Sequence, residues 1–417
     1  METSAGRRRR PTGSVERETR RRRSWHKPGR PAGGADDMTL AMRWARTLAL
    51  CAAVTAAGTP RAEPGVSPTE IVIGQNITLQ GGKNSYGVEV EAGVQVFLDA
   101  VNRSGGVNGR RVKLRVLDDD NQATKAEENA RQLVRDGVFL LFGSLEGGPS
   151  TAVMKVAVDS KLPFFGPMAG SPTLRRPHQP LVFPVRAEHR EEFRALVGWG
   201  ARTGLKRVGF LHADSDVGRM HLENVKLAAD EAGVAFGVGV PFKSDITDAQ
   251  LAEVLRGFEA ARVDMVLNHG SASIYTRLIR LARASGSRIT FMAVNSGSSQ
   301  IAHALGELSQ GMVFSQILPS PWSRKTAITR EYQEAFALSQ PGREFSYGSL
   351  EGYLTAKALV MALKLAGPNP TRESFVKGLA GASFDLGGVN ASYAPGRHSG
   401  STFVDLAMVT RAGKFLQ

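Results

Sequence analysis

The stretch Val112 to Ser144, VKLRVLDDDNQATKAEENARQLVRDGVFLLFGS, says more about the fold than any other part of the chain. It reads as an apolar strand, an acidic turn, an amphipathic helix, a second strand and a loop of small residues. Within the helix, Ala126, Ala130 and Leu133 recur at helical spacing, which buries one stripe and leaves the charged residues in water. The stretch therefore predicts one strand–helix–strand unit.

The second strand of this unit, Val138 to Phe142, is a continuous apolar run. Such a strand needs cover on both faces, so helices must pack above and below a parallel sheet. In a sheet of this kind, ligands bind beyond the carboxyl ends of the strands. We therefore expect an α/β fold with functional residues in the loops that follow strands.

The same alternation of strand and helix runs through most of the chain after residue 68, in two series, and predicts two doubly wound parallel-sheet lobes. A tail after about residue 350 departs from it, with a helix and then a hairpin around Ala412 and Gly413. The expected strands are Ile71–Ile73, Val138–Phe142 and Leu162–Gly166 in the first series, and Val208–Leu211, Val234–Val240, Met265–Leu267 and Ile289–Val294 in the second.

The charge of the chain is concentrated near its start. The net charge is +14 over 417 residues, but residues 1–62 hold 14 Lys and Arg against 5 Asp and Glu, so the remaining 355 residues carry only +5. Residues 1–41 form a basic extension without apolar periodicity, which predicts disorder. It is either a nucleic-acid tether or a segment upstream of the true translation start. We favour the second interpretation, and expect no nucleic-acid partner, because a secretion leader follows directly.

Residues 42–62 have the pattern of a signal peptide. Arg43 and Arg46 precede an apolar run, Thr47 to Ala57, and small residues follow, so we expect export to the periplasm. The run is shorter than the roughly 20 residues that span a bilayer. Cys51, the only cysteine, lies inside it, so we expect no disulfide or thiol chemistry. Lipid anchoring at Cys51 is disfavoured, because Leu50 is bulky where a lipid-attachment box has a small residue.

Several ordered motifs resemble one family. They are LFGSLEGGPSTA at Leu141–Ala152, FFGPMAGSPTLRRP at Phe164–Pro177 and RVGFLHADSDVGR at Arg207–Arg219, with SLEGYLTAKAL from Ser349 and FDLGG from Phe384. Together they resemble the extracytoplasmic substrate-binding proteins of ABC importers, in the branch related to the leucine, isoleucine and valine binding proteins. The resemblance runs from about Pro68 to the end of the chain.

The resemblance implies the type I periplasmic binding protein fold, in which two lobes are joined by three crossovers, here near Arg186, Ile317 and His398. Lobe 1 would be residues 63–186 plus 318–398, and lobe 2 residues 187–317 plus 399–417. It implies a monomer without catalytic activity that closes on a small polar or carboxylate-bearing ligand and passes it to a membrane permease, its only link to the membrane. The alternative is a ligand-sensing receptor that controls a signalling partner.

In the resembled family the first lobe holds its ligand through two loops. Here they read Leu145, Glu146, Gly147 and Gly148, and Ala169, Gly170 and Ser171. Small residues let backbone N–H groups and helix N-termini approach an anion. The alternatives are that the glycines serve tight turns and that Ser171 caps a helix.

The sequence departs from the amino-acid binders of this family at three positions. Gly147 and Gly170 stand where hydroxyl side chains are expected, and Asn295 stands near the expected acid. An ammonium group in the cleft would then need its counter-charge from Glu146, Asp214 or Asp216, because an unpaired buried charge is costly. For Glu146 the alternative is a solvated carboxylate or one paired with an arginine.

Further candidates lie in loops that follow strands. Tyr86 could form a wall of the cleft or pack at a helix start. His269, with Gly270 and Ser271, could donate to a ligand oxygen or be a structural histidine. Asp216 could reach the cleft or only cap the next helix.

We find no signature of an enzyme, a metal site or a cofactor. HExxH, GxSxG and Walker A sequences are absent, and so is a GxGxxG that opens a helix. The acidic run Asp118 to Asp120 belongs to a strand end and turn, where alternation splays the side chains to opposite faces. We therefore expect a binding protein with no cofactor and no metal.

Overall fold

The computed structural model describes residues 63–79, 85–411 and 415–416, all within one compact unit that spans residues 62–417. The predicted extension, the predicted signal peptide and the turn of the predicted hairpin at Ala412 and Gly413 lie outside the described residues. No helix in these ranges has both the length and the apolar character needed to cross a membrane.

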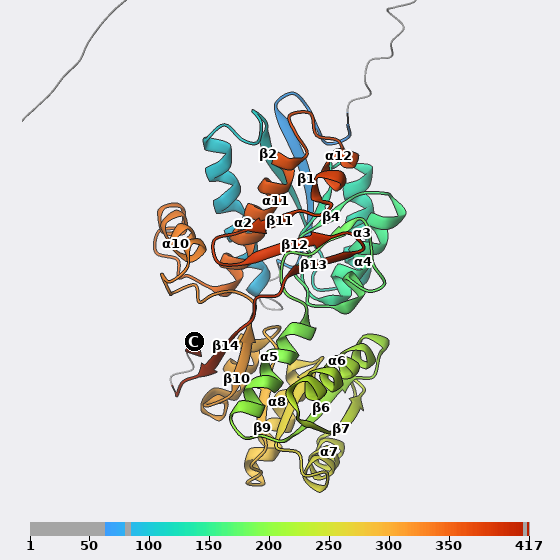
Figure 1. Cartoon of the computed structure of the whole chain (residues 1–417), viewed down its shortest axis with the longest axis vertical. Coiled ribbons are helices and arrows are strands. Elements are labelled where there is room, and N and C mark those ends of the chain that lie inside the picture. Colours follow the sequence, from blue (N-terminus) through green and yellow to red (C-terminus); the bar gives the residue numbers. More distant parts are fainter. Residues whose placement is uncertain (1–62, 80–84, 412–414, 417) are drawn as a thin grey trace, which may run out of the picture. The chain divides into compact units, whose positions relative to one another are not determined.

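The first lobe is built on a five-stranded parallel sheet with the strand order β2-β1-β3-β4-β5 (Figure 1). The order reverses between β1 and β3, and this switch point is where a doubly wound sheet presents ligand-binding loops. The bounds are β1 Glu70–Ile77, β2 Arg111–Asp118, β3 Leu141–Phe142, β4 Phe164–Phe165 and β5 Val182–Phe183.

The second lobe repeats this topology in strands β6 to β10, whose order is β7-β6-β8-β9-β10 and whose pairs are all parallel. Two antiparallel strands, β14 and β15, extend the sheet beyond β10. The bounds are β6 Arg207–Ala213, β7 Ala235–Phe242, β8 Met265–His269, β9 Thr290–Ala293, β10 Val313–Gln316, β14 Asp405–Val409 and β15 Phe415–Leu416. The prediction of two doubly wound parallel sheets is therefore confirmed.

Helices connect the strands in both lobes. In the first lobe they are α2 Ser85–Arg103, α3 Ala123–Arg135, α4 Gly147–Asp159, the short η1 Pro172–Leu174, α10 Ala327–Ser339, α11 Tyr347–Leu365 and α12 Arg372–Leu379. In the second lobe they are α5 His189–Arg202, α6 Asp216–Ala232, α7 Asp248–Ala260, α8 Ala272–Ala284, α9 Ser298–Leu305 and η2 Gly306–Ser309.

The tail differs from a simple strand–helix repeat. After α12 the chain forms a three-stranded antiparallel sheet of β11 Ser383–Asp385, β12 Asn390–Ala394 and β13 Arg397–Ser401, which contacts β5 of the first lobe. His398, near which we expected the third crossover, therefore lies inside β13. The chain enters the sheet of the second lobe only at β14.

Each parallel sheet is covered on both faces, as the apolar run Val138–Phe142 predicts. Alternate residues of β1 enter different cores, with Ile71 and Ile73 in one and Val72 against the other. Along β8, Val266 belongs to one core while Met265 and Leu267 belong to another. Because helices cover both faces, the loops at the carboxyl ends of the strands are the parts of each sheet that are free to form a site.

Helices α2 and α11 pack side by side over the first sheet, and glycines set their separation. A Cβ atom on Gly93 would lie 1.9 Å from the carbonyl oxygen of Ser349, and one on Gly352 would lie 2.0 Å from that of Val90. Backbone carbonyls cannot move aside as a flexible side chain can. Because α2 begins with Ser85 and Tyr86 and α11 carries Glu351, this close contact also fixes one wall of the cleft described below.

We predict that Gly352→Ala destabilises the protein by about 1–3 kcal/mol, because the added methyl group forces the two helices apart. Gly257→Ala is the matched control, since a Cβ there meets nothing within 4 Å in the interior of α7. The control should raise stability by about 0.5–1 kcal/mol. Urea unfolding followed by circular dichroism measures both changes, and equal effects of the two substitutions would contradict this account of the helix contact.

Candidate functional site

A cleft with about 800 Å³ of empty space, counted with its open mouth, lies between the two lobes. The first lobe lines it from the start of α2, from the loop after β3 and from the loop after β4. The second lobe contributes the loop between β9 and α9 and the start of α5. Its walls include Ser85, Tyr86, Glu89, Leu145, Glu146, Gly147, Met168, Ala169, Gly170, Arg186, His189, Asn295 to Gln300 and Tyr347.

The cleft widens outward into a second hollow, which shares Glu146, Gly147, His189 and Ser296 with the first. This outer part adds residues from α3, α4, the start of η1 and the loop after β8, among them Gly148, Ser171, His269 and Gly270. The two hollows form one continuous cleft. Of the predicted site residues, eleven line it: Tyr86, Leu145, Glu146, Gly147, Gly148, Ala169, Gly170, Ser171, His269, Gly270 and Asn295.

The structure does not bring the other two predicted residues into the cleft. Asp216 is the first residue of α6, its side chain is 94% exposed, and it forms an ion pair with Arg219. Ser271 is the N-cap of α8, where its hydroxyl accepts from the Ile274 N–H. Each side chain therefore has its partner in the first turn of its own helix and not in the cleft.

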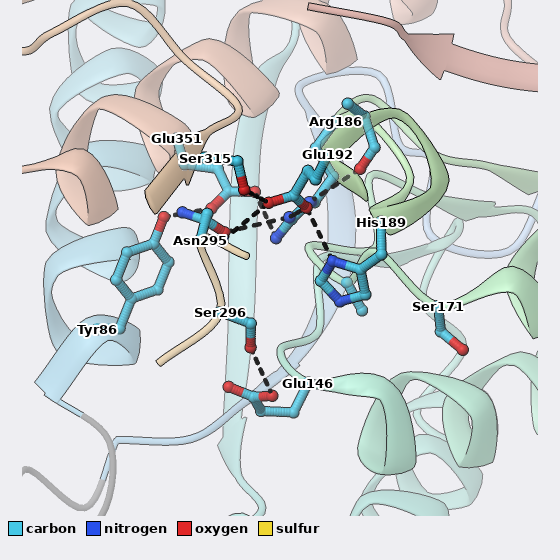
Figure 2. Close-up of polar contacts among 12 residues, drawn as sticks. Tyr86, Glu146, Ser171, Arg186, His189, Glu192, Asn295, Ser296, Ser315 and Glu351 are labelled. Carbon is cyan, nitrogen blue, oxygen red and sulfur yellow. Dashed lines mark hydrogen bonds and ion pairs between the residues drawn. The ribbon is translucent and has the colours of Figure 1, made fainter. Parts of the chain in front are cut away.

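Glu146 has an unusual backbone conformation. Its φ is +59°, a region that residues with a Cβ rarely occupy, and it directly precedes α4. Its carboxylate does not cap that helix and instead accepts from the Ser296 hydroxyl at 3.3 Å. Figure 2 shows this contact, which joins the first lobe to the second across the cleft. Strained conformations of this kind persist where the surrounding structure imposes them, often at ligand sites.

Gly170 makes room for a histidine. A Cβ at this position would lie 2.5 Å from Nδ1 of His189, so the imidazole occupies the space that a side chain would fill. The ring lines both parts of the cleft. Where the resembled amino-acid binders have a hydroxyl in this loop, the cleft of this chain thus has an imidazole.

Glu192 is the centre of a buried polar network (Figure 2). It is fully buried, and its two oxygens accept from Arg186 at 3.0 Å, His189 at 2.8 Å, the Asn295 N–H at 2.8 Å and Ser315 at 2.6 Å. Burial alone would raise the pKa of Glu192, but its neighbours outweigh burial and lower the pKa to about 2. The carboxylate is therefore ionised and accepts only, so Nδ1 of His189 must donate and Nε2 is left for the cleft.

Arg186 extends this network to the first lobe. Its Nη2 also donates to Asn295 at 3.1 Å, and its Nη1 lies 3.9 Å from Oε1 of Glu351 on α11. The other oxygen of Glu351 accepts from the Tyr86 hydroxyl at 2.5 Å. Burial raises the pKa of Glu351 and that of Tyr86, so Tyr86 stays protonated as a donor. Tyr86 is consequently both a wall of the cleft and part of the network.

His269 is a neutral group in the outer cleft. Burial lowers its pKa to about 3, and its ring centroid lies 3.8 Å from that of His221, which is fully buried. Its Nδ1 is buried without a hydrogen-bond partner, which is least costly if that nitrogen carries no hydrogen. The hydrogen then sits on Nε2, so the ring offers a donor.

Sequence reasoning did not assign a role at the site to Arg186, His189, Glu192 or Glu351. One signal was available, because His189, Glu192 and Leu196 fall on the same inward stripe of α5. A charged residue within the apolar stripe of a helix indicates a buried partner. The partners themselves come from distant segments, which no local pattern reveals.

Comparisons with known proteins agree on one family. A family model described as periplasmic binding protein matches residues 70–414. The Leu/Ile/Val-binding protein homolog 3 of Brucella melitensis is 23% identical over 166 residues, which cover 40% of this chain and 45% of that protein. The chain thus matches less than half of the length of this relative.

Two further comparisons extend over more of the chain. The leucine-, isoleucine-, valine-, threonine-, and alanine-binding protein of Pseudomonas aeruginosa is 23% identical over 270 residues, 64% of this chain and 71% of that protein. The solved structure of the fatty acid ABC transporter substrate-binding protein from Thermomonospora curvata has a TM-score of 0.72 at 20% identity, and the match covers 85% of this chain and 93% of that one. The structural likeness shows the shared fold.

We predict that Glu192→Gln destabilises the protein by about 3 kcal/mol at pH 7, because it leaves Arg186 buried without its ionised partner. The folded-state pKa of about 2 lies below the ordinary 4.5, so the stability that this carboxylate contributes is present above the higher value and is lost as the pH falls toward the lower one. The difference between variant and parent should therefore shrink over that range.

Unfolding by guanidinium at a series of pH values measures this effect. Glu253→Gln is the control, since that side chain is 70% exposed and pairs with Arg256 at the surface. The control should change stability by less than about 1 kcal/mol. A difference between Glu192→Gln and the parent protein that does not vary with pH would show that the Glu192 carboxylate is not held ionised.

Proposed function

Because the chain belongs to the periplasmic binding protein family, we propose that it captures a small polar ligand in the cleft between its lobes and delivers it to an ABC importer. The observation that carries the proposal is the cleft itself, whose walls come from both lobes and which the Glu146–Ser296 contact spans. A ligand that touches both walls stabilises the closed arrangement, and a permease can then distinguish the loaded protein from the empty one.

The charges of the inner cleft support a ligand with a cationic group. Arg186 is matched by Glu192 and faces Glu351 as well, so it offers little free positive charge. Two further carboxylates line the cleft, Glu89 and Glu146, and both belong to the first lobe. An amino or similar group of the ligand would supply their counter-charge.

The helix start beside Glu146 supports a ligand that also has oxygen acceptors. Gly147 and Gly148 are the first residues of α4, whose unpaired N–H groups favour an anion, whereas Nε2 of His189 is an acceptor when Nδ1 donates to Glu192 and suits an N–H or O–H group of the ligand. An amino-acid-like ligand satisfies the carboxylates with its ammonium group and the start of α4 with its carboxylate. The name of the Pseudomonas aeruginosa relative gives amino acids as its ligands, whereas a fatty acid would bring an apolar tail and a further negative charge into a cleft that Glu89 and Glu146 already line.

A thermal-shift screen tests ligand capture. It should include amino acids, their N-acetyl derivatives, amides, aromatic acids and short carboxylates. A ligand at one hundred times its dissociation constant adds about 2.7 kcal/mol of stability. We expect free amino compounds to raise the melting temperature and their N-acetyl derivatives, which lack the cation, to fail.

We predict that Glu146→Gln weakens the binding of any amino compound found in the screen by about tenfold or more, because a charge-assisted hydrogen bond contributes roughly 1.5–3 kcal/mol. Glu259→Gln is the matched control, an exposed glutamate in the last turn of α7 and away from the cleft. Isothermal titration calorimetry gives both dissociation constants. If Glu146→Gln weakened cationic and purely anionic compounds equally, Glu146 would not be the charge partner.

A further inference from the structure

A separate hollow lies at the junction of the lobes and shares no residue with the cleft. It has about 1170 Å³ of empty space, counted with its mouth, and it is formed by the segment after η1, the first turns of α5 and the segment that begins with β13. We call it the arginine chamber because five arginines line it: Arg175, Arg176, Arg190, Arg194 and Arg397. Only two carboxylates, Glu188 and Glu191, oppose them there.

The carboxylates of the chamber are already used. Arg176 donates to both oxygens of Glu188, one of them at 2.7 Å, and Arg194 donates to Glu191 at 2.6 Å. Among the described residues, neither Arg190 nor Arg397 has an acidic side chain within ion-pair distance. Arg194 also donates to both oxygens of Glu231 outside the chamber, so within the described part of the chain the positive charge without an acidic partner is that of Arg175, Arg190 and Arg397.

Arg175 gives the second, independent indication of a ligand. It is 9% exposed, and its Nε is buried without a hydrogen-bond partner. Burial lowers its pKa to about 10, which still leaves the guanidinium charged at neutral pH. A buried cation with an unused donor and no ion pair is costly unless a counter-ion reaches it.

We propose that the arginine chamber binds a small soluble oxyanion of the phosphate class. Guanidinium groups donate two parallel hydrogen bonds to such ions, and a tetrahedral oxyanion can accept from several arginines at once. The deep residues of the chamber, Arg175 and Glu188, are nearly inaccessible. An ion that enters the chamber meets the more exposed Arg190 and Arg397, whereas the flat surface of a bilayer does not fit into it.

This site would act on the cleft through Arg175. The Nη1 of Arg175 donates to the carbonyl oxygens of Ala169 and Ser171, at 3.3 and 3.2 Å, and its Nη2 donates to that of Arg186 at 2.9 Å. All three residues line the cleft. An ion in the chamber would stabilise the Arg175 guanidinium through its charge, and with it the binding loop after β4. By linkage, the ion and the ligand of the cleft would then influence each other's affinity.

The test uses the full chain and no cleft ligand, so its result does not depend on the proposed function. Sodium phosphate is titrated at constant ionic strength into the parent protein and into the double variant Arg190→Gln/Arg397→Gln. Calorimetry should show saturable binding to the parent and about a tenfold or larger loss of affinity in the variant. Arg135→Gln/Arg202→Gln, which removes two exposed helix-end arginines outside the chamber, is the charge-matched control and should bind as the parent does.

Hydrogen exchange provides a second readout. Phosphate should slow exchange in the segment 167–174 of the parent and of the control, and leave it unchanged in the chamber variant. The single variant Arg397→Gln, at an exposed position, serves if the double variant does not fold.

Three outcomes would overturn the proposal: an equal response to chloride, undiminished phosphate binding by the chamber variant, or an equal loss in the control. Binding to vesicles that contain phosphatidylglycerol, without any response to free phosphate, would overturn it as well.

Discussion

The buried ion pair between Arg186 and Glu192 is the interaction on which the geometry of the cleft depends. Two charges out of water are tolerated only when nearly every donor and acceptor around them is used. Glu192 meets that condition with four donors, which come from the crossover segment, α5, the loop after β9 and β10. The Glu192 carboxylate thus joins elements that are far apart in sequence through hydrogen bonds. It does so near Arg186, where the chain crosses from the first lobe to the second.

This arrangement explains why the cleft is not built as the resembled amino-acid binders led us to expect. Glu192 fixes the His189 ring, and the ring needs the space beside Gly170. A side chain at position 170 would collide with this imidazole, so the chain has a glycine there in place of a residue with a hydroxyl. Asn295 carries no charge and belongs to the same network, because its Oδ1 accepts from Arg186 and its backbone N–H donates to Glu192. The carboxylates that face the cleft lie on the first lobe instead, in Glu89 and Glu146.

Local patterns predicted most of the fold and only the loops of the site. Helix α3 and the buried run Val138–Phe142 follow directly from periodicity and composition, and parallel topology then places residues such as Glu146 at the ligand-facing edge. The antiparallel strands β11 to β13 were missed because they are short and pair with one another, outside the strand–helix alternation of the lobes. The Glu192 network was missed for a related reason, since each of its bonds but one joins residues from separate segments.

Arg175 lines the chamber and also donates to the carbonyl oxygens of the binding loop and of Arg186, so the crossover region does more than join the lobes. A crossover that only joined the lobes would need flexible backbone and no buried charge. Here it contains the carbonyl of Arg186, which Arg175 holds, and the side chain of Arg186, which Glu192 and Asn295 hold. Any movement of the lobes must therefore keep these buried groups paired or expose them to water. The cost of leaving a buried charge unpaired limits the lobe arrangements that the chain can adopt, and a ligand or ion that adds a partner in one arrangement selects it.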